Sequence, residues 1–209
     1  MICSMAVRRW AGWRAVACVA LLAATACSSS SKKATPSATV PTAPAQTTTT
    51  DPYAVPAVID AAYVNRVLAG LDAASGDVTR LIVSTRSIPP EVIERLKALY
   101  ANPAVLQLSL DGYQQSLSNG LKGFRPNPGD VHTRTSQLLT ATQSCIFAEV
   151  SRDYSATAVN PGPESPEWVA LRPKAVDDAN NYNPTPWAFI YDGFERGGGP
   201  PKNPCETAS

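Results

Sequence analysis

The feature that most constrains the fold is a change of hydrophobic period partway along the chain. Between residues 57 and 118 apolar side chains recur about every four residues, which is the spacing of helices with one buried face. From residue 131 onward apolar and polar residues alternate, as in half-buried strands. Helices followed by strands predict an α+β domain in which the helices pack on one face of an antiparallel sheet.

Helical stretches are expected over residues 57–73, 78–83, 90–100 and 103–118. The first two are predicted to be separate helices, because Ser75-Gly76 disfavours helix and Asp77 can cap a new one. Glu91, in the first turn of the third stretch, suits the positive end of a helix dipole. The segment 105–110 also fits a strand, so the fourth stretch has two interpretations.

Strands are expected over residues 131–139, 145–154, 168–171 and 187–191. The second of these shows the clearest alternation. Its even-numbered residues from Ile146 to Tyr154 share one face, and its odd-numbered residues, including Glu149 and Asp153, share the other. Trp168 and Trp187 are expected in the core.

Residues 1–26 have the order of a secretory leader. Three arginines precede an apolar run over residues 15–24, and small residues follow it. Polar residues begin at Ser28, so the run is shorter than the roughly 20 apolar residues of a spanning helix. Ala24-Thr25-Ala26-Cys27 resembles a bacterial lipobox, which implies that Cys27 is acylated and becomes the first residue of the mature protein. A cleaved signal with an incidental cysteine is the alternative.

The leader also changes the charge of the mature protein. The leader contains three arginines and no acidic residue, so its removal lowers the net charge from +1 for the full chain to −2 for the mature chain. Lys32 and Lys33 lie in the segment before Asp51, so the part from Asp51 onward carries about −4. This balance argues against a nucleic-acid partner, which needs a basic surface. Residues 28–50 are rich in Ser, Thr and Pro and predict a disordered tether. The tether would join a lipid anchor at the outer face of the cytoplasmic membrane to a folded domain over 51–209.

Of the five cysteines, this assignment leaves two that can form a disulfide. Cys3 and Cys18 lie in the leader and Cys27 is the lipid site, which leaves Cys145 and Cys205. Two thiols in the oxidising cell envelope most simply form a disulfide, and two free buried cysteines are the alternative. The bond would close a loop of about 60 residues and contribute about 4 kcal/mol if its effect is mainly on the entropy of the unfolded chain.

The order of a long helix, shorter helices and a strand meander resembles the NTF2-like fold, also called cystatin-like or SnoaL-like. The resemblance lies in residues 63–66 (Tyr-Val-Asn-Arg), 145–148 (Cys-Ile-Phe-Ala) and 183–187 (Asn-Pro-Thr-Pro-Trp). The chain is also similar to small exported actinobacterial lipoproteins that carry such a domain. The resemblance implies a curved antiparallel sheet of about four strands around a pocket closed by helices. Members bind different ligands and some are enzymes, so no single activity is implied.

Candidate site residues come from the predicted sheet, since the sequence holds no catalytic signature. Its one histidine, His132, begins a strand and is expected to be exposed or capping, and neither a Gly-x-Ser-x-Gly elbow nor a phosphate-binding glycine motif occurs. We therefore assign no catalytic residue, no metal site and no cofactor. An NTF2-like pocket would mix aromatic residues with acids. The candidates are Glu149, Asp153, Tyr154, Trp187 and Tyr191, with Asp192 nearby.

Two functions fit these observations. The first is a non-catalytic, lipid-anchored envelope module that binds a partner protein, a wall component or a lipid. The second is a small-molecule pocket protein or enzyme that uses Asp153 or Glu149 with a tyrosine. A deep cavity holding a carboxylate with a strongly raised pKa would favour the second function. A solid core with those carboxylates in solvent would favour the first.

Overall fold

The computed structural model describes residues 51–163, 165–174, 180–193 and 200–206. The predicted leader, the lipid site at Cys27 and the tether lie outside these ranges. In the described part of the chain, no helix combines the length and the apolar character needed to cross a membrane.

Three helices form the first half of the described domain. They are α1 (Ala61–Thr85), α2 (Pro90–Leu99) and α3 (Pro103–Ser118). α1 begins where the Asp60 side chain accepts a hydrogen bond from the Tyr63 backbone N–H at 2.7 Å. In the same way, Asn102 accepts from the Ala104 N–H at 2.9 Å and caps α3. Residues 105–110 are therefore helical, and the strand interpretation is wrong.

α1 runs without a break through Ser75-Gly76, so the prediction of two separate helices is wrong. Glycine costs a helix interior about 1 kcal/mol relative to alanine. At Gly76 the absent side chain leaves room for a carboxylate, since a Cβ there would lie 2.0 Å from Asp130 Oδ1. Arg80 holds that carboxylate, because its Nη1 donates to Oδ1 at 2.7 Å. The buried stripe of α1 also continues past the glycine to Ile82, which keeps the helix on the core.

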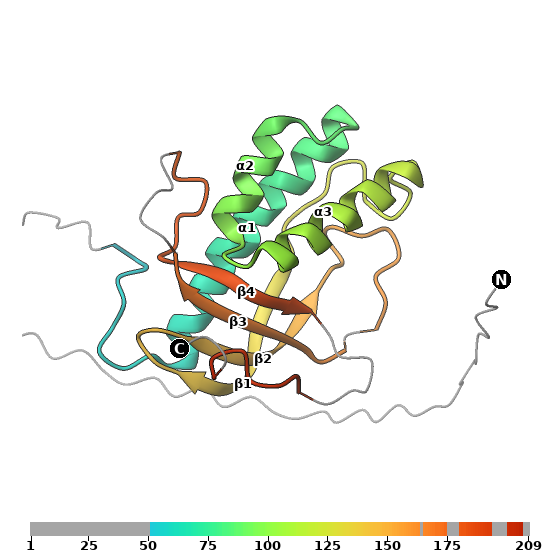
Figure 1. Ribbon diagram of the computed structural model, residues 1–209. Coiled ribbons are helices and arrows are strands. Elements are labelled where there is room, and N and C mark those ends of the chain that lie inside the picture. The colour runs from blue at the N-terminus through green and yellow to red at the C-terminus, as the bar shows by residue number, and fades with distance from the viewer. Residues whose placement is uncertain (1–50, 164, 175–179, 194–199, 207–209) are drawn as a thin grey trace, which may run out of the picture. The chain divides into compact units, whose positions relative to one another are not determined.

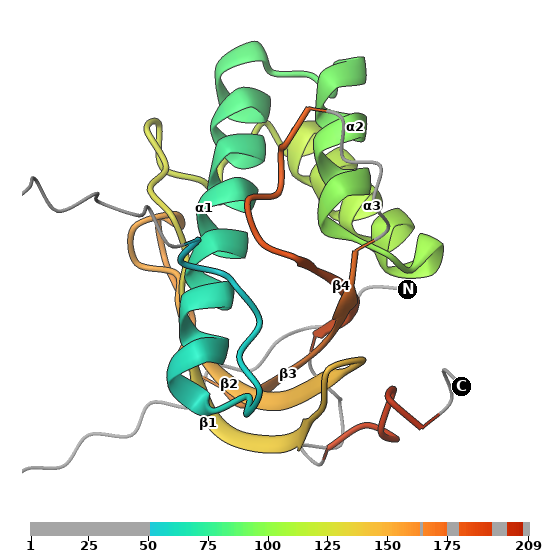
Figure 2. The same ribbon diagram turned by 90° about the vertical axis from the view of Figure 1, so that its left-hand side faces the viewer.

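Four strands form one antiparallel sheet in the order β1-β2-β3-β4. They are β1 (His132–Ala141), β2 (Ile146–Asp153), β3 (Glu167–Pro173) and β4 (Trp187–Gly193). The register of β1 against β2 shifts after Thr135 and again after Leu138, and such irregularities bend a strand. Figure 2 shows the sheet curving from β1 to β4. The predicted α+β class, with helices on a curved antiparallel sheet, is confirmed.

The helices lie together on one face of the sheet (Figure 1). Ile146, Ala148 and Val150 of β2 point toward them and share one apolar core with the buried stripes of α1 and α2. Trp187 is fully buried in this core, and its indole N–H donates to Tyr63 Oη at 2.8 Å. The predicted division of residues 145–154 into two faces is therefore confirmed, and the even-numbered residues Ile146, Ala148 and Val150 are the ones that face the helices.

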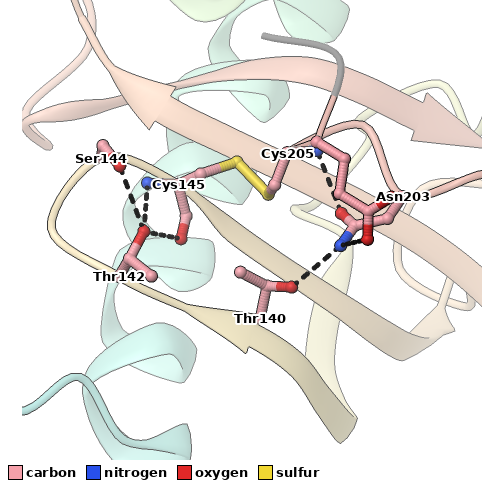
Figure 3. Close-up of a disulfide and its surroundings, with 7 residues drawn as sticks. Thr140, Thr142, Ser144, Cys145, Asn203 and Cys205 are labelled. Atoms are coloured by element: carbon pink, nitrogen blue, oxygen red, sulfur yellow. Dashed lines mark hydrogen bonds between the residues drawn. A yellow bond between two sulfur atoms is a disulfide. The ribbon is translucent and has the colours of Figure 1, made fainter. Parts of the chain in front are cut away.

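The opposite face of the sheet carries a smaller apolar cluster. Phe147, Trp168 and Ala170 form it, and Cys205 from the C-terminal segment packs against it. Cys205 makes a disulfide with Cys145, which lies 60 positions earlier in the chain (Figure 3). The predicted pairing is confirmed, and the C-terminal segment is covalently held on the face away from the helices.

Hydrogen bonds fix both ends of this disulfide (Figure 3). The Cys145 N–H donates to Thr142 Oγ1 at 3.0 Å, within the turn between β1 and β2. Asn203 accepts from the Cys205 N–H at 3.0 Å and donates through Nδ2 to Thr140 Oγ1 at 3.2 Å. The C-terminal segment is thus bound to β1 at Thr140 and to the turn before β2 at Cys145.

Candidate functional site

A cavity of about 210 Å³ lies among α1, α3, the inner face of the sheet and two loops. The space is partly open to solvent, and its volume is large enough to hold a small ligand. Much of its wall is aromatic. The aromatic residues are Tyr100, Tyr113, Phe124, Tyr154 and Phe189.

A buried arginine, Arg152, forms the centre of the polar wall. It continues the inward alternation of β2, and its side chain is only 11% exposed. Its Nη1 donates to Glu167 Oε2 at 2.9 Å, and its Nη2 donates to Asp192 Oδ1 at 2.5 Å. Burial disfavours the charge of Arg152, but attraction to Asp192 and Glu167 outweighs it and raises the pKa. The Nε–H of this arginine finds no hydrogen-bond partner among the described residues.

Three tyrosines bring hydroxyl groups to the cavity. Tyr154 donates to Glu167 Oε1 at 2.9 Å, and the Tyr100 hydroxyl lies 3.5 Å from Asp192 Oδ2. The Tyr113 hydroxyl lies 3.0 Å from a threonine hydroxyl of α1. Burial raises the pKa of all three phenols, that of Tyr154 to about 12. They are therefore neutral hydrogen-bonding groups at physiological pH.

A further carboxylate, Asp72, reaches the cavity from α1. It accepts hydrogen bonds from the Thr133 N–H and the Thr133 hydroxyl, both at 2.8 Å. Burial disfavours the charged form of Asp72 and raises its pKa to about 6. The hydrogen bonds from Thr133 and the positive charge of Arg152 lower the pKa, and the negative charge of Asp192 raises it further. Asp72 also borders an outer groove of about 460 Å³, which His132 lines as well. The carboxyl can therefore exchange a proton near neutral pH beside both spaces.

Two loops that contribute Phe124 and Thr157 to the wall are bonded to each other by their backbones. The Arg125 N–H donates to the Thr157 carbonyl at 2.9 Å, and the Val159 N–H donates to the Gly123 carbonyl at 3.0 Å. Backbone pairing of this kind holds the wall in place independently of side-chain packing.

α3 covers the cavity with half-buried side chains only. Tyr113 lines the cavity, and Leu106, Leu110 and Leu117 pack against the core. None of the residues of α3 is buried, whereas eleven residues of α1 are. α3 is therefore the most weakly packed helix of the described domain.

Of the five predicted pocket residues, Tyr154 lines the cavity and the other four do not. Glu149 and Asp153 are odd-numbered residues of β2, so they lie on the face away from the helices; Asp153 is exposed and Glu149 half-buried. Trp187 is a core residue, and Tyr191 packs in the cluster on the opposite face. Asp192, named beside these candidates, does line the cavity.

Sequence reasoning missed Asp72, Tyr100 and Tyr113. Asp72 follows Leu71 on the buried side of α1, and an acid within an apolar helical stripe is a signal of a buried, paired carboxylate. Arg152 gives the same signal at an inward position of β2. His132 is exposed at the start of β1, as predicted.

The chain has no match in any of three comparisons with known proteins. No family model, no curated protein and no solved structure matches it. Within the described ranges, no group of three or more His, Cys, Asp or Glu side chains could hold a metal ion. The fold and the site together define an α+β domain with a partly open cavity that is walled by aromatic rings and a buried ionic cluster.

Proposed function

We propose that the chain is a lipid-anchored protein of the cell envelope whose α+β domain binds a small molecule in the cavity. The observation that carries the proposal is a cavity of about 210 Å³ whose wall holds Arg152, Asp192 and Asp72. Burying charged groups costs free energy, and unfilled space loses packing. A ligand that fills the space and contacts these groups would offset both costs.

The cavity suits a ligand about the size of one substituted ring. An engineered protein cavity of about 150 Å³ binds benzene, whereas sites for drug-sized ligands begin near about 300 Å³. The aromatic walls would contact the apolar body of the ligand, and the ionic cluster would orient its polar group. A pocket between helices and a curved sheet is also what the NTF2-like resemblance implies. These features favour a pocket protein over a module with a solid core.

A second candidate function is acid–base catalysis in the same cavity. The pKa of Asp72, about 6, suits proton transfer near neutral pH, and three phenol groups stand nearby. The acid of this candidate is thus Asp72 instead of Asp153 or Glu149. Conversion of a bound compound that Asp72→Asn abolishes would support the enzyme, and recovery of the compound unchanged would support the binder.

In this proposal, the lipid anchor and the envelope location rest on the leader sequence. Acyl chains on Cys27 would hold the protein at the outer face of the cytoplasmic membrane, since two or more chains give durable attachment. Replacing Cys27→Ser should move the chain from the membrane fraction to the soluble fraction. A wild-type chain found in the soluble fraction would refute the anchoring.

Cavity binding can be tested with three single-ring probes of matched shape: benzylammonium, benzyl alcohol and benzoate. Titration of the full-length chain, followed by calorimetry or by NMR shifts, should show saturable binding of at least one probe. Ser75 lines the cavity from α1, so Ser75→Phe should fill the space and abolish binding. Ser84→Phe, at an exposed position of α1, is the matched control and should bind like the wild type. Circular dichroism checks that both variants fold. Absence of binding by all three probes, or binding that Ser75→Phe leaves unchanged, would refute the function.

A further inference from the structure

We infer that the cavity selects a small organic cation, namely an amine or quaternary ammonium compound with an apolar body about the size of one ring. The inference rests on the proposed small-molecule function and adds the chemical class of the ligand. It is drawn from the charge, the free hydrogen-bonding capacity and the aromatic character of the wall.

The ionic groups at the cavity carry a surplus of negative charge. Arg152 is the single cation among the described residues that line the space, and both of its Nη groups are already bound, to Glu167 and to Asp192. Asp72 adds another carboxylate, which is bonded to uncharged donors of Thr133. Among the described residues that line the cavity, one positive and two negative groups leave a net charge of −1 when all are ionised, and Glu167, which pairs with Arg152 but does not line the space, brings the cluster to −2. A ligand cation reduces this surplus, and a ligand anion increases it.

The two carboxylates that line the cavity keep lone pairs for a ligand. Among the described residues, the one hydrogen-bond contact of Asp192 Oδ2 is to the Tyr100 hydroxyl at 3.5 Å, which is at the limit of hydrogen-bond length. Each oxygen of Asp72 accepts one bond from Thr133, and a carboxylate oxygen can accept two. An ammonium group, which is rich in donors, matches these unused acceptors.

The aromatic wall favours the same ligand class. The faces of Tyr and Phe rings attract cations through their quadrupoles, and the attraction strengthens where water is excluded. Five aromatic residues line the cavity, and its three tyrosines stay uncharged because burial raises the pKa of each phenol. The rings can therefore contact the apolar body of the ligand and its charged end alike.

The Nε–H of Arg152 gives a ligand no further contact. It has no hydrogen-bond partner among the described residues, but it is enclosed and presents almost no accessible surface to the cavity. A ligand carboxylate would therefore share the space with Asp72 and Asp192 without a free donor to compensate. The like charges make an acid the poorer occupant.

The three matched probes separate the ligand class from the function itself. Titrated against the full-length chain, benzylammonium should bind at least about tenfold more tightly than benzyl alcohol, and benzoate should bind most weakly. Asp72→Asn should bring benzylammonium close to benzyl alcohol by weakening the binding of the charged probe, and it should change the affinity for the neutral alcohol much less. Asp153→Asn, which removes an exposed carboxylate outside the cavity, is the control and should leave all three affinities unchanged.

The contrary outcomes are distinct. Benzyl alcohol or benzoate binding as tightly as benzylammonium would overturn the cation preference and leave the small-molecule function standing. A preference for benzylammonium that Asp72→Asn does not reduce would also overturn the inference, because the negative wall would not be its source. Failure of all three probes to bind would overturn the proposed function together with the inference.

Discussion

Replacing Asp72 by asparagine should stabilise the protein at neutral pH, although the residue is partly buried and hydrogen-bonded at the cavity wall. Burial raises the pKa of Asp72 from its ordinary value of 3.8 to about 6. Each pK unit is worth about 1.4 kcal/mol, so the ionised carboxylate costs the folded state about 3 kcal/mol. The folded protein binds this proton more tightly than the unfolded chain does. The group therefore favours folding fully below about pH 4, and that contribution is lost as the pH rises through about 6.

Asparagine at position 72 has no ionisable group, but it can keep the hydrogen-bonded geometry around the side chain. Its side-chain oxygen can accept from the Thr133 N–H, and its Nδ2 can donate to the Thr133 hydroxyl. The charges around Asp72 are unchanged in the variant, so the difference from the wild type reports on this carboxyl. The charged groups inside the cavity are Arg152 and Asp192, and those along the outer groove are Asp130 and Arg134, beside His132.

Thermal unfolding at about pH 4 and about pH 7.5 measures the effect. Asp72→Asn should raise Tm by about 6–12 °C at the higher pH, given about 2–4 °C per kcal/mol for a chain of this size, and by little at the lower pH. Asp153→Asn is the control: the Ser155 N–H bond lowers the pKa of that exposed carboxyl, so its removal should bring no gain at neutral pH. A lower Tm for Asp72→Asn at about pH 7.5, or an equal difference at both pH values, would refute the reasoning.

Two further predictions concern the ionic cluster and the disulfide. Arg152→Met should lower the free energy of unfolding by about 3–5 kcal/mol, because Glu167 and Asp192 stay buried without their cation. Denaturant titration measures this loss, and an unchanged midpoint would show that water already solvates the carboxylates. Cys205→Ser should lower the free energy of unfolding by about 2–4 kcal/mol, because the unfolded chain loses the constraint on a loop that spans 60 positions. Reductant should lower the Tm of the wild type to that of the variant, and equal Tm values with and without reductant would contradict the prediction.

The class of the fold and the order of its elements could be predicted because burial repeats along the chain with a local period. The alternation over residues 145–154 reports directly that one face of β2 meets the helices. The continuity of α1 could not be predicted in this way. Gly76 is tolerated because it makes room for Asp130, and Asp130 lies far away in the sequence. Local helix propensity therefore predicted that the helix ends near Gly76, whereas the helix continues there because the glycine makes room for Asp130.

The site was predicted on the wrong face for a related reason. Acids were sought on the polar side of β2, where Glu149 and Asp153 lie, but that side turns away from the helices. The charged residues of the cavity instead lie on faces that are otherwise apolar and buried. Arg152 interrupts the apolar face of β2, and Asp72 interrupts that of α1. Only the folded chain shows that these exceptions, with Asp192 of β4, surround one space.

α3 is less well packed than α1 and the sheet, and this difference bears on the affinity and on the exchange rate of a bound ligand. Local opening is cheapest where few side chains are buried, and α3 has no fully buried residue. α1 and the sheet carry Asp72, Arg152 and Asp192, whereas α3 contributes Tyr113 to the aromatic wall. If the domain binds a ligand as proposed, substitutions of the three charged groups would act mainly on affinity. Substitutions that loosen the packing of α3 would act also on the rates of binding and release.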